Sequence, residues 1–140
     1  MDDKRFNAEY AVLAKHLPEN LFRFERKDRT LWLKAAARTN RGNVYTLAFD
    51  LSAFPSGVPM VYVTQMLKDK AKRDLDRPDG GMHVLASDHG WTRICHYGAQ
   101  SWTPMVSLFK VYVKCRLWLE MYELHLQTGK PIDYYLNHQS

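Results

Sequence analysis

The chain has 140 residues, of which 46% are hydrophobic and 25% charged, which is the ordinary balance of a globular protein in water. Its formal net charge is +5, but the 20 Lys and Arg residues are spread along the whole chain among 15 acidic residues, without the dense basic tract that typifies nucleic-acid binding. No stretch approaches the roughly 20 apolar residues that span a bilayer, and the charged start of the chain is unlike a signal peptide, so we expect one cytoplasmic domain, residues 1–140, with neither membrane nor nucleic acid as a partner.

The first half of the chain reads as one helix followed by strands. Residues 5–17 place Phe6, Tyr10, Leu13 and Leu17 on one stripe of an amphipathic helix, which Pro18 ends. Four strand-like runs follow, at residues 21–25, 30–36, 43–51 and 60–64. Their connections are too short for parallel crossovers, so we predict an antiparallel four-stranded meander.

Two irregular segments interrupt or follow these strands. Phe54-Pro55-Ser56-Gly57-Val58-Pro59 cannot continue a strand ladder and predicts a rigid bend. Residues 66–81 alternate in charge and end in the turn-forming Arg77-Pro78-Asp79-Gly80-Gly81. We expect this second segment to be a solvated loop and the most mobile internal part of the chain.

The last third predicts one long helix, from Met105 to about Leu126. Thr103 is a suitable N-cap, Pro104 suits the first helical position, and Gly129 supplies the stop. Apolar residues recur at steps of three and four along it, at Leu108, Val111, Cys115, Trp118 and Tyr122. The predicted fold is therefore α+β: an N-terminal helix, a four-stranded antiparallel meander, an irregular loop that carries a cysteine, and a long C-terminal helix.

The two cysteines have different surroundings. Cys115 lies on the apolar stripe of the predicted helix, so we expect a buried thiol. Cys95 lies before the polar run His96-Tyr97-Gly98-Ala99-Gln100-Ser101, and His83 and His89 lie within twelve residues of it. Proton-exchanging groups beside a thiol favour the reactive thiolate, which makes Cys95 the candidate nucleophile.

Two other uses of these side chains fit less well. His83, His89 and Cys95 are spaced six residues apart, which matches no common zinc-ligand pattern, so we expect no metal and no cofactor. A papain-like hydrolase would carry its cysteine at a helix N-terminus, whereas Cys95 lies about nine residues before the predicted helix.

The order of these features resembles the ubiquitin-conjugating enzyme family. In that family a Tyr-Pro-x-x-x-Pro turn joins the third and fourth strands, and residues 54–59 match it with Phe for Tyr. A His-Pro-Asn motif precedes an Ile/Val-Cys pair there, which His83 and Ile94-Cys95 match, and a Trp-Ser/Thr-Pro motif opens the next helix, which Trp102-Thr103-Pro104 matches. The resemblance covers about residues 43–120.

The chain also departs from the family pattern. Val84-Leu85 replaces Pro-Asn, so the asparagine that would stabilise the oxyanion is missing. Residues 66–81 look like an insertion, and only residues 131–140 follow the long helix, where eukaryotic members carry further helices. These departures are similar to the small bacterial conjugating-type proteins of CBASS antiphage operons.

The resemblance implies a transferase. Cys95 would carry the C-terminus of a partner protein as a thioester and pass it to an amine, with His83 or His89 as the oxyanion donor. The implied partner is a cyclic GMP-AMP synthase-like nucleotidyltransferase or a ubiquitin-like protein, with or without an activating enzyme. Two alternatives stay open: a non-catalytic binding module on the same fold, and a thiol hydrolase that cleaves such conjugates.

Overall fold

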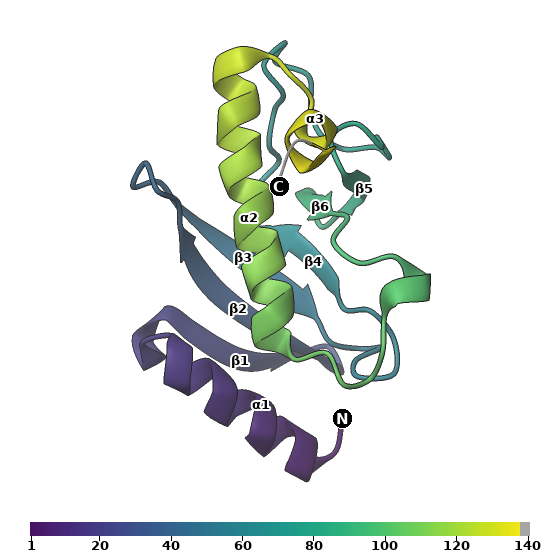
Figure 1. The fold of residues 1–140 in the computed structure, drawn as a ribbon. Helices are drawn as coiled ribbons and strands as arrows, with labels where there is room; N and C mark the ends of the chain where they lie inside the picture. Colours follow the sequence, from purple (N-terminus) through teal and green to yellow (C-terminus); the bar gives the residue numbers. More distant parts are fainter. Residues whose placement is uncertain (138–140) are drawn as a thin grey trace.

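The helices of the computed structural model pack on an antiparallel sheet, which makes an α+β fold (Figure 1). The structure describes residues 1–137. The helices are α1 (Asp3–His16), α2 (Leu108–Thr128) and α3 (Ile132–Asn137), and the 3-10 turns are η1 (Glu19–Leu21) and η2 (Ala99–Ser101). The strands are β1 (Phe22–Lys27), β2 (Thr30–Arg38), β3 (Val44–Asp50), β4 (Met60–Val63), β5 (Val84–Asp88) and β6 (Trp91–Ile94).

The sheet of the described residues has six strands, in the order β1-β2-β3-β4-β6-β5, and all neighbours run antiparallel. Strands β1 to β4 occupy the four predicted runs. The sheet continues beyond them, however, because β6 pairs with β4 and carries β5 on its other edge. The expected four-stranded meander is therefore corrected to a six-stranded sheet.

The hairpin of β5 and β6 turns at a site that the sequence did not reveal. Asp88 pairs with Trp91, and the two residues between them, His89 and Gly90, have positive φ of 58° and 74°. This is the backbone of a type I′ turn, whose twist matches that of the flanking strands. A histidine at its first central position is uncommon, which is why the turn signal was missed.

The core lies between the sheet and α2, which crosses one sheet face in Figure 1. The sheet contributes fully buried side chains at Leu33, Leu47, Phe49, Val61, Val63 and Ile94. The helix contributes Leu108, Val111, Cys115, Trp118 and Leu119. On the other face, a second cluster packs Trp32 and Tyr62 over Ala48. Of the helices in residues 1–137, none is long and apolar enough to cross a membrane.

Helix α2 begins three residues later than the sequence predicted. Its N-cap is Ser107, whose side chain accepts the N–H of Lys110 at 3.1 Å, instead of Thr103. Pro104 precedes the helix in a separate turn, and its carbonyl oxygen accepts a 2.6 Å hydrogen bond from the Arg5 guanidinium. Arg5, near the other end of the chain, therefore stabilises this segment in a non-helical conformation. Such a long-range contact cannot be predicted from the local sequence.

The segment at residues 66–81 is more firmly anchored than expected. Leu67 and Leu75 are only 5% and 4% exposed, and both belong to the core. The hydroxyl of Thr92 accepts the N–H of Leu67 and donates to the carbonyl oxygen of Leu75. The tip, residues 71–74, is exposed. Two buried leucines eight positions apart therefore anchor this otherwise charged segment to the hydrophobic core.

Candidate functional site

The candidate nucleophile, Cys95, lies directly after β6. Ile94 before it is buried in the core, whereas Cys95 is partly exposed. The N–H of Cys95 donates to the carbonyl oxygen of His83 at 2.9 Å, so the main chains of these two residues pair at the open end of the β5–β6 hairpin. Cys115 is fully buried, and this burial raises the pKa of its thiol. The predicted burial of Cys115 is confirmed.

His83 is held by an acidic residue that the sequence analysis did not single out. Its Nε2 lies 2.9 Å from Oδ1 of Asp133, in α3, and the N–H of Asp133 donates to the carbonyl oxygen of Gly81 at 2.8 Å. Because a carboxylate oxygen only accepts, this contact favours the tautomer with hydrogen on Nε2 and leaves Nδ1 as a proton acceptor. His83 also has a positive φ of 51°.

Nothing in the local sequence pointed to Asp133. It is fifty positions away from His83, on a short helix that was not predicted. The contact between α3 and the turn at Gly81 brings the two side chains together. Asp133 therefore contacts the His83 side chain, and the main chain of His83 pairs with that of Cys95, so three separate segments meet at one end of the hairpin.

His89 lies at the other end of the hairpin. Its ring contacts Trp32, Tyr62 and Trp91 at centroid distances of 5.4, 5.4 and 5.3 Å. The four residue steps from Trp91 to Cys95 span about 13 Å at strand rise. The structure thus pairs the main chain of His83 with that of Cys95 and places His89 at the opposite end of the hairpin.

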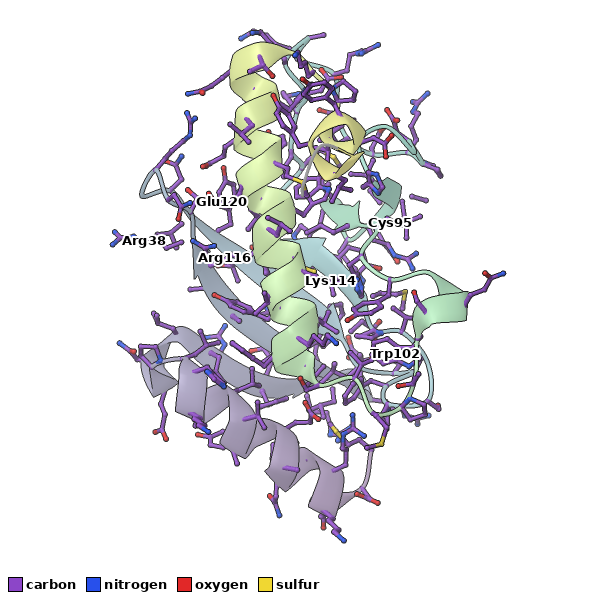
Figure 2. The ribbon with its side chains drawn as sticks, in the orientation of Figure 1. Arg38, Cys95, Trp102, Lys114, Arg116 and Glu120 are labelled. Atoms are coloured by element: carbon purple, nitrogen blue, oxygen red, sulfur yellow. The ribbon has the colours of Figure 1, made fainter. Side chains whose placement is uncertain are left out.

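The loop after Cys95 packs against the bend at residues 54–59. His96 Nε2 lies 2.9 Å from the carbonyl oxygen of Pro59, and Trp102 Nε1 donates to that of Pro55 at 3.0 Å. The Lys114 ammonium lies 3.8 Å from the centroid of the Tyr97 ring. In Figure 2, Trp102, Lys114 and Cys95 lie to one side of α2, opposite Arg38 and Glu120. The bend and α2 thus support the loop that follows the thiol.

A small hollow, here called the His96 cavity, lies beside this loop. Its volume is about 200 Å³. It is lined by Val58, Pro59, Met60, Leu85, Arg93, Ile94, His96 and Tyr97. Burial lowers the pKa of His96 to about 4, so its imidazole is neutral near pH 7. The cavity adjoins the candidate nucleophile along the chain, since Arg93, His96 and Tyr97 lie within two residues of Cys95.

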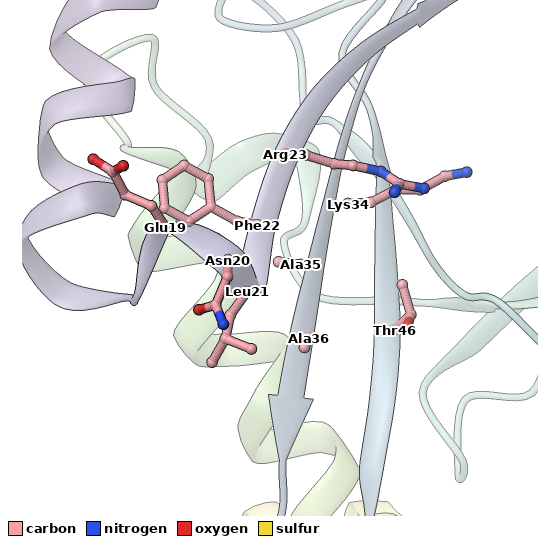
Figure 3. Close-up of a pocket in the computed structure, with 9 residues that line it drawn as sticks. All are labelled: Glu19, Asn20, Leu21, Phe22, Arg23, Lys34, Ala35, Ala36 and Thr46. Carbon is pink, nitrogen blue, oxygen red and sulfur yellow. The ribbon is translucent and has the colours of Figure 1, made fainter.

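Other hollows lie away from Cys95. A depression of about 410 Å³ is formed by η1 and strands β1, β2 and β3, and Figure 3 shows Arg23 and Lys34 projecting together beside it. No cysteine or histidine lines it, so it offers no nucleophile–base pair. A hollow of about 520 Å³ is lined by charged residues of both signs between positions 69 and 79. Across residues 1–137, no group of three or more His, Cys, Asp or Glu side chains could hold a metal ion.

Comparison with known proteins gives no further assignment. The chain matches no protein-family model, no curated protein and no solved structure. The functional argument therefore rests on the geometry around Cys95 and on the motifs of residues 43–120.

Proposed function

We propose that this protein is a ubiquitin-conjugating-like acyltransferase. Cys95 receives the C-terminal acyl group of a partner protein as a thioester and passes it to an amine. The observation that carries the proposal is that the partly exposed Cys95 pairs through its main chain with His83, whose ring is held by the Asp133 carboxylate. Covalent acyl transfer generally uses a nucleophile with a base that a third group orients, and His83 with Asp133 would supply that base to Cys95.

The first step is an exchange of acyl groups at sulfur. The Cys95 thiolate attacks the carbonyl carbon of an activated C-terminus, a C–S bond forms, and the group that activated the carbonyl leaves with its electron pair. Sulfur suits this task because a thiolate is both a good nucleophile and a good leaving group. The activated donor is itself a thioester or an acyl adenylate, which an activating enzyme supplies.

The second step transfers the acyl group to nitrogen. The amine attacks the thioester carbon, the C–N bond forms, the C–S bond breaks, and the Cys95 thiolate leaves. The amine must also lose a proton. In the tautomer set by Asp133, His83 offers Nδ1 as the acceptor of that proton. Asp133 is then a positioning residue, because it holds the ring without touching the reacting atoms.

The partners follow from the resemblance of residues 43–120 to conjugating enzymes. We propose that the acyl donor is a cyclic GMP-AMP synthase-like nucleotidyltransferase in antiphage defence, and that the acceptor amine belongs to a lysine. The hydrogen bond from Trp102 to the carbonyl oxygen of Pro55 is consistent with the resemblance, because it joins two of the three motifs that carry it.

The His83–Asp133 pair also favours a second candidate, a thiol hydrolase that cleaves such conjugates. In that reaction water replaces the amine in the second step, and His83 takes the proton of the water. The same three side chains serve both reactions. Only the acceptor distinguishes them, so the experiment must offer both amine and water.

The test is a thiol-sensitive gel shift with the nucleotidyltransferase, its activating enzyme and free lysine. The unaltered protein should form a band that reducing agent removes and that lysine discharges. Cys95→Ser should give a band that resists reducing agent, because an alkoxide leaves less readily than a thiolate, and Cys95→Ala should give none. His83→Gln should form the thioester at the normal rate (charging) but transfer the acyl group to lysine (discharge) about 100- to 10,000-fold more slowly. This is the usual loss when a general base is removed.

Two matched controls keep the result specific. Cys115→Ala removes the other thiol, and His89→Gln removes a histidine that lies away from the site; both should charge and discharge normally. Conjugation by Cys95→Ala at the unaltered rate would leave only the binding-module alternative. Discharge at the same rate with and without lysine would identify the hydrolase.

A further inference from the structure

A hollow lies between the β1–β2 turn and the β5–β6 turn. Its volume is about 230 Å³, and we name it the Trp32 hollow after a residue of its wall. Its lining comes from strands β1, β2 and β3, from the β1–β2 turn, and from His89 and Trp91 of the β5–β6 hairpin. Neither Cys95 nor His83 lines it, so it is separate from the proposed reaction centre.

The strand register shows on which face of the sheet the hollow opens. Glu25 is paired with Trp32, and Trp32 with Asp50, so the three residues form one row across β1, β2 and β3. Directly opposed side chains leave an antiparallel sheet on the same face. Leu33, the next residue after Trp32, is buried in the core beneath α2, so the row projects from the opposite face. The carboxylates of Glu25 and Asp50 therefore lie on either side of the Trp32 side chain.

Three rings form an aromatic wall of the hollow. The ring centroids of His89 and Trp91 lie 5.4 and 6.1 Å from that of Trp32 and 5.3 Å from each other. Trp32 is only 7% exposed, but Trp91 is partly exposed and the His89 side chain is 42% exposed, so a ligand can reach the wall. The Lys34 ammonium already lies 5.9 Å from the Trp91 ring centroid. Aromatic faces attract cations in this way.

The hollow carries a negative charge on a positively charged protein. Its charged lining consists of three carboxylates and two ammonium groups, from Glu25, Asp28, Asp50, Lys27 and Lys34. Lys34 Nζ lies 2.6 Å from Glu25 Oε1, and these two charges compensate each other. Within residues 1–137, neither Asp28 nor Asp50 has an ion-pair partner. The lining therefore attracts a cation, although the whole chain carries a formal charge of +5.

The acceptors of the hollow restrict that cation further. Asp50 Oδ1 accepts both the N–H and the hydroxyl of Ser52, at 2.9 and 2.6 Å, which fixes the carboxylate. Its Oδ2 has no hydrogen bond within residues 1–137. A carboxylate oxygen can only accept, so a ligand with N–H groups fits and a quaternary ammonium leaves the acceptor unpaired. A guanidinium combines in-plane donors for a carboxylate with a flat face that stacks on indole.

We infer that the Trp32 hollow binds an alkylguanidinium, whose flat face packs on the aromatic wall and whose N–H groups donate to Asp50. The same chemistry is found in an arginine side chain of a partner protein and in a free small guanidine. A volume of about 230 Å³ admits one guanidinium with a short alkyl chain. The thioester reaction uses none of these residues, so the inference stands apart from the proposed function.

The experiment follows the indole N–H resonances of the full chain by ¹H–¹⁵N NMR at pH 7 while ethylguanidinium chloride is added. Ethylurea, which has the same shape but no charge, is the matched probe. The Trp32 and Trp91 resonances should move saturably, and ethylurea should bind at least tenfold more weakly. The indole of Trp118 is the internal control, because it is buried in the core and donates to the Met82 carbonyl oxygen.

Variants and a third probe complete the test. Asp50→Asn and Asp28→Asn remove one charge each and should weaken ethylguanidinium binding severalfold, whereas Asp74→Asn, outside the hollow, should not. Asp28 has a positive φ of 50°, which asparagine tolerates, so that variant keeps its fold.

N-acetylarginine N-methylamide distinguishes the two sources. Tighter binding than that of ethylguanidinium indicates an arginine side chain of a partner protein, and equal or weaker binding indicates a free small guanidine. Equal binding of ethylurea, the absence of a saturable shift with ethylguanidinium, or unchanged affinity in both Asp50→Asn and Asp28→Asn would overturn the inference.

Discussion

Glu9 of α1 and Leu108 of α2 are joined by a 2.7 Å hydrogen bond, in which the Glu9 carboxylate accepts the backbone N–H that begins α2. The other oxygen of Glu9 lies 2.9 Å from the Arg5 guanidinium, which also donates to the carbonyl oxygens of Pro104 and Val106. The first helix therefore holds both the start of α2 and the end of the loop that carries Cys95.

Glu9→Gln should lower the free energy of unfolding by about 1–3 kcal/mol, because it removes the charge from a buried acceptor at a helix N-terminus. Glu9 is 5% exposed, so solvent screens it little. Urea unfolding followed by circular dichroism measures the change. Glu19→Gln, on the exposed turn after α1, is the matched control and should change little. Equal effects of the two substitutions would contradict the anchoring role of Glu9.

The two thiols should react at very different rates. Brief treatment of the native protein with iodoacetamide should label Cys95 well before Cys115, because Cys95 is partly exposed while burial both hides Cys115 and raises its pKa. Peptide mass spectrometry locates the label. In urea the two rates should converge, and preferential labelling of Cys115 in the native protein would reverse the assignment.

Asp133→Asn should slow thioester discharge roughly tenfold or more and leave charging unchanged, because it releases the His83 ring without altering Cys95. In the background of His83→Gln the same substitution should cost nothing further, since the residue acts only through His83. The unaltered protein, the two single variants and the double variant form a double-mutant cycle. A single-turnover discharge assay on these four proteins measures the coupling between Asp133 and His83. Additive losses would mean that Asp133 acts independently of His83.

His96 should make the protein less stable in acid. Its pKa falls from 6.5 to about 4 on folding because of burial, so the unfolded chain binds a proton that the folded chain does not. Stability is therefore lost as the pH falls from about 6.5 to about 4, by up to about 3 kcal/mol. Urea unfolding at pH 7 and pH 4.5 should show a smaller loss for His96→Gln than for the exposed control His16→Gln. Equal losses would remove His96 as the cause.

Within residues 66–81, hydrogen exchange should be uneven. The N–H groups of Leu67, Lys70 and Leu75 should exchange slowly, because they donate to Thr92 Oγ1, His125 Nε2 and the Leu67 carbonyl oxygen. The exposed tip should exchange fast. His125→Ala should accelerate exchange at Lys70 at least tenfold and leave Leu67 as the internal control. Uniformly fast exchange across residues 66–81 would instead support a solvated, mobile loop and contradict the anchoring by Leu67 and Leu75.

The sequence by itself determined those helices and strands whose hydrophobic residues repeat at regular spacing. The stripe from Leu108 to Tyr122 predicted a helix that buries Cys115, and the alternating runs predicted β1 to β4 within a few residues of their ends. These features could be read because hydrophobic spacing along a few turns or one strand reports directly which face is buried. The same reasoning identified Cys95 as the thiol outside the core.

Only the tertiary structure decided which residues of distant segments lie near Cys95. His83 and His89 looked equivalent in the sequence, each within twelve residues of the thiol. The type I′ turn at His89 folds β5 back along β6, which brings His83 to Cys95 and carries His89 to the opposite end. Asp133 joins them because α3 docks on Gly81. Strand pairing and helix docking join residues far apart in the chain, and no local pattern encodes that pairing.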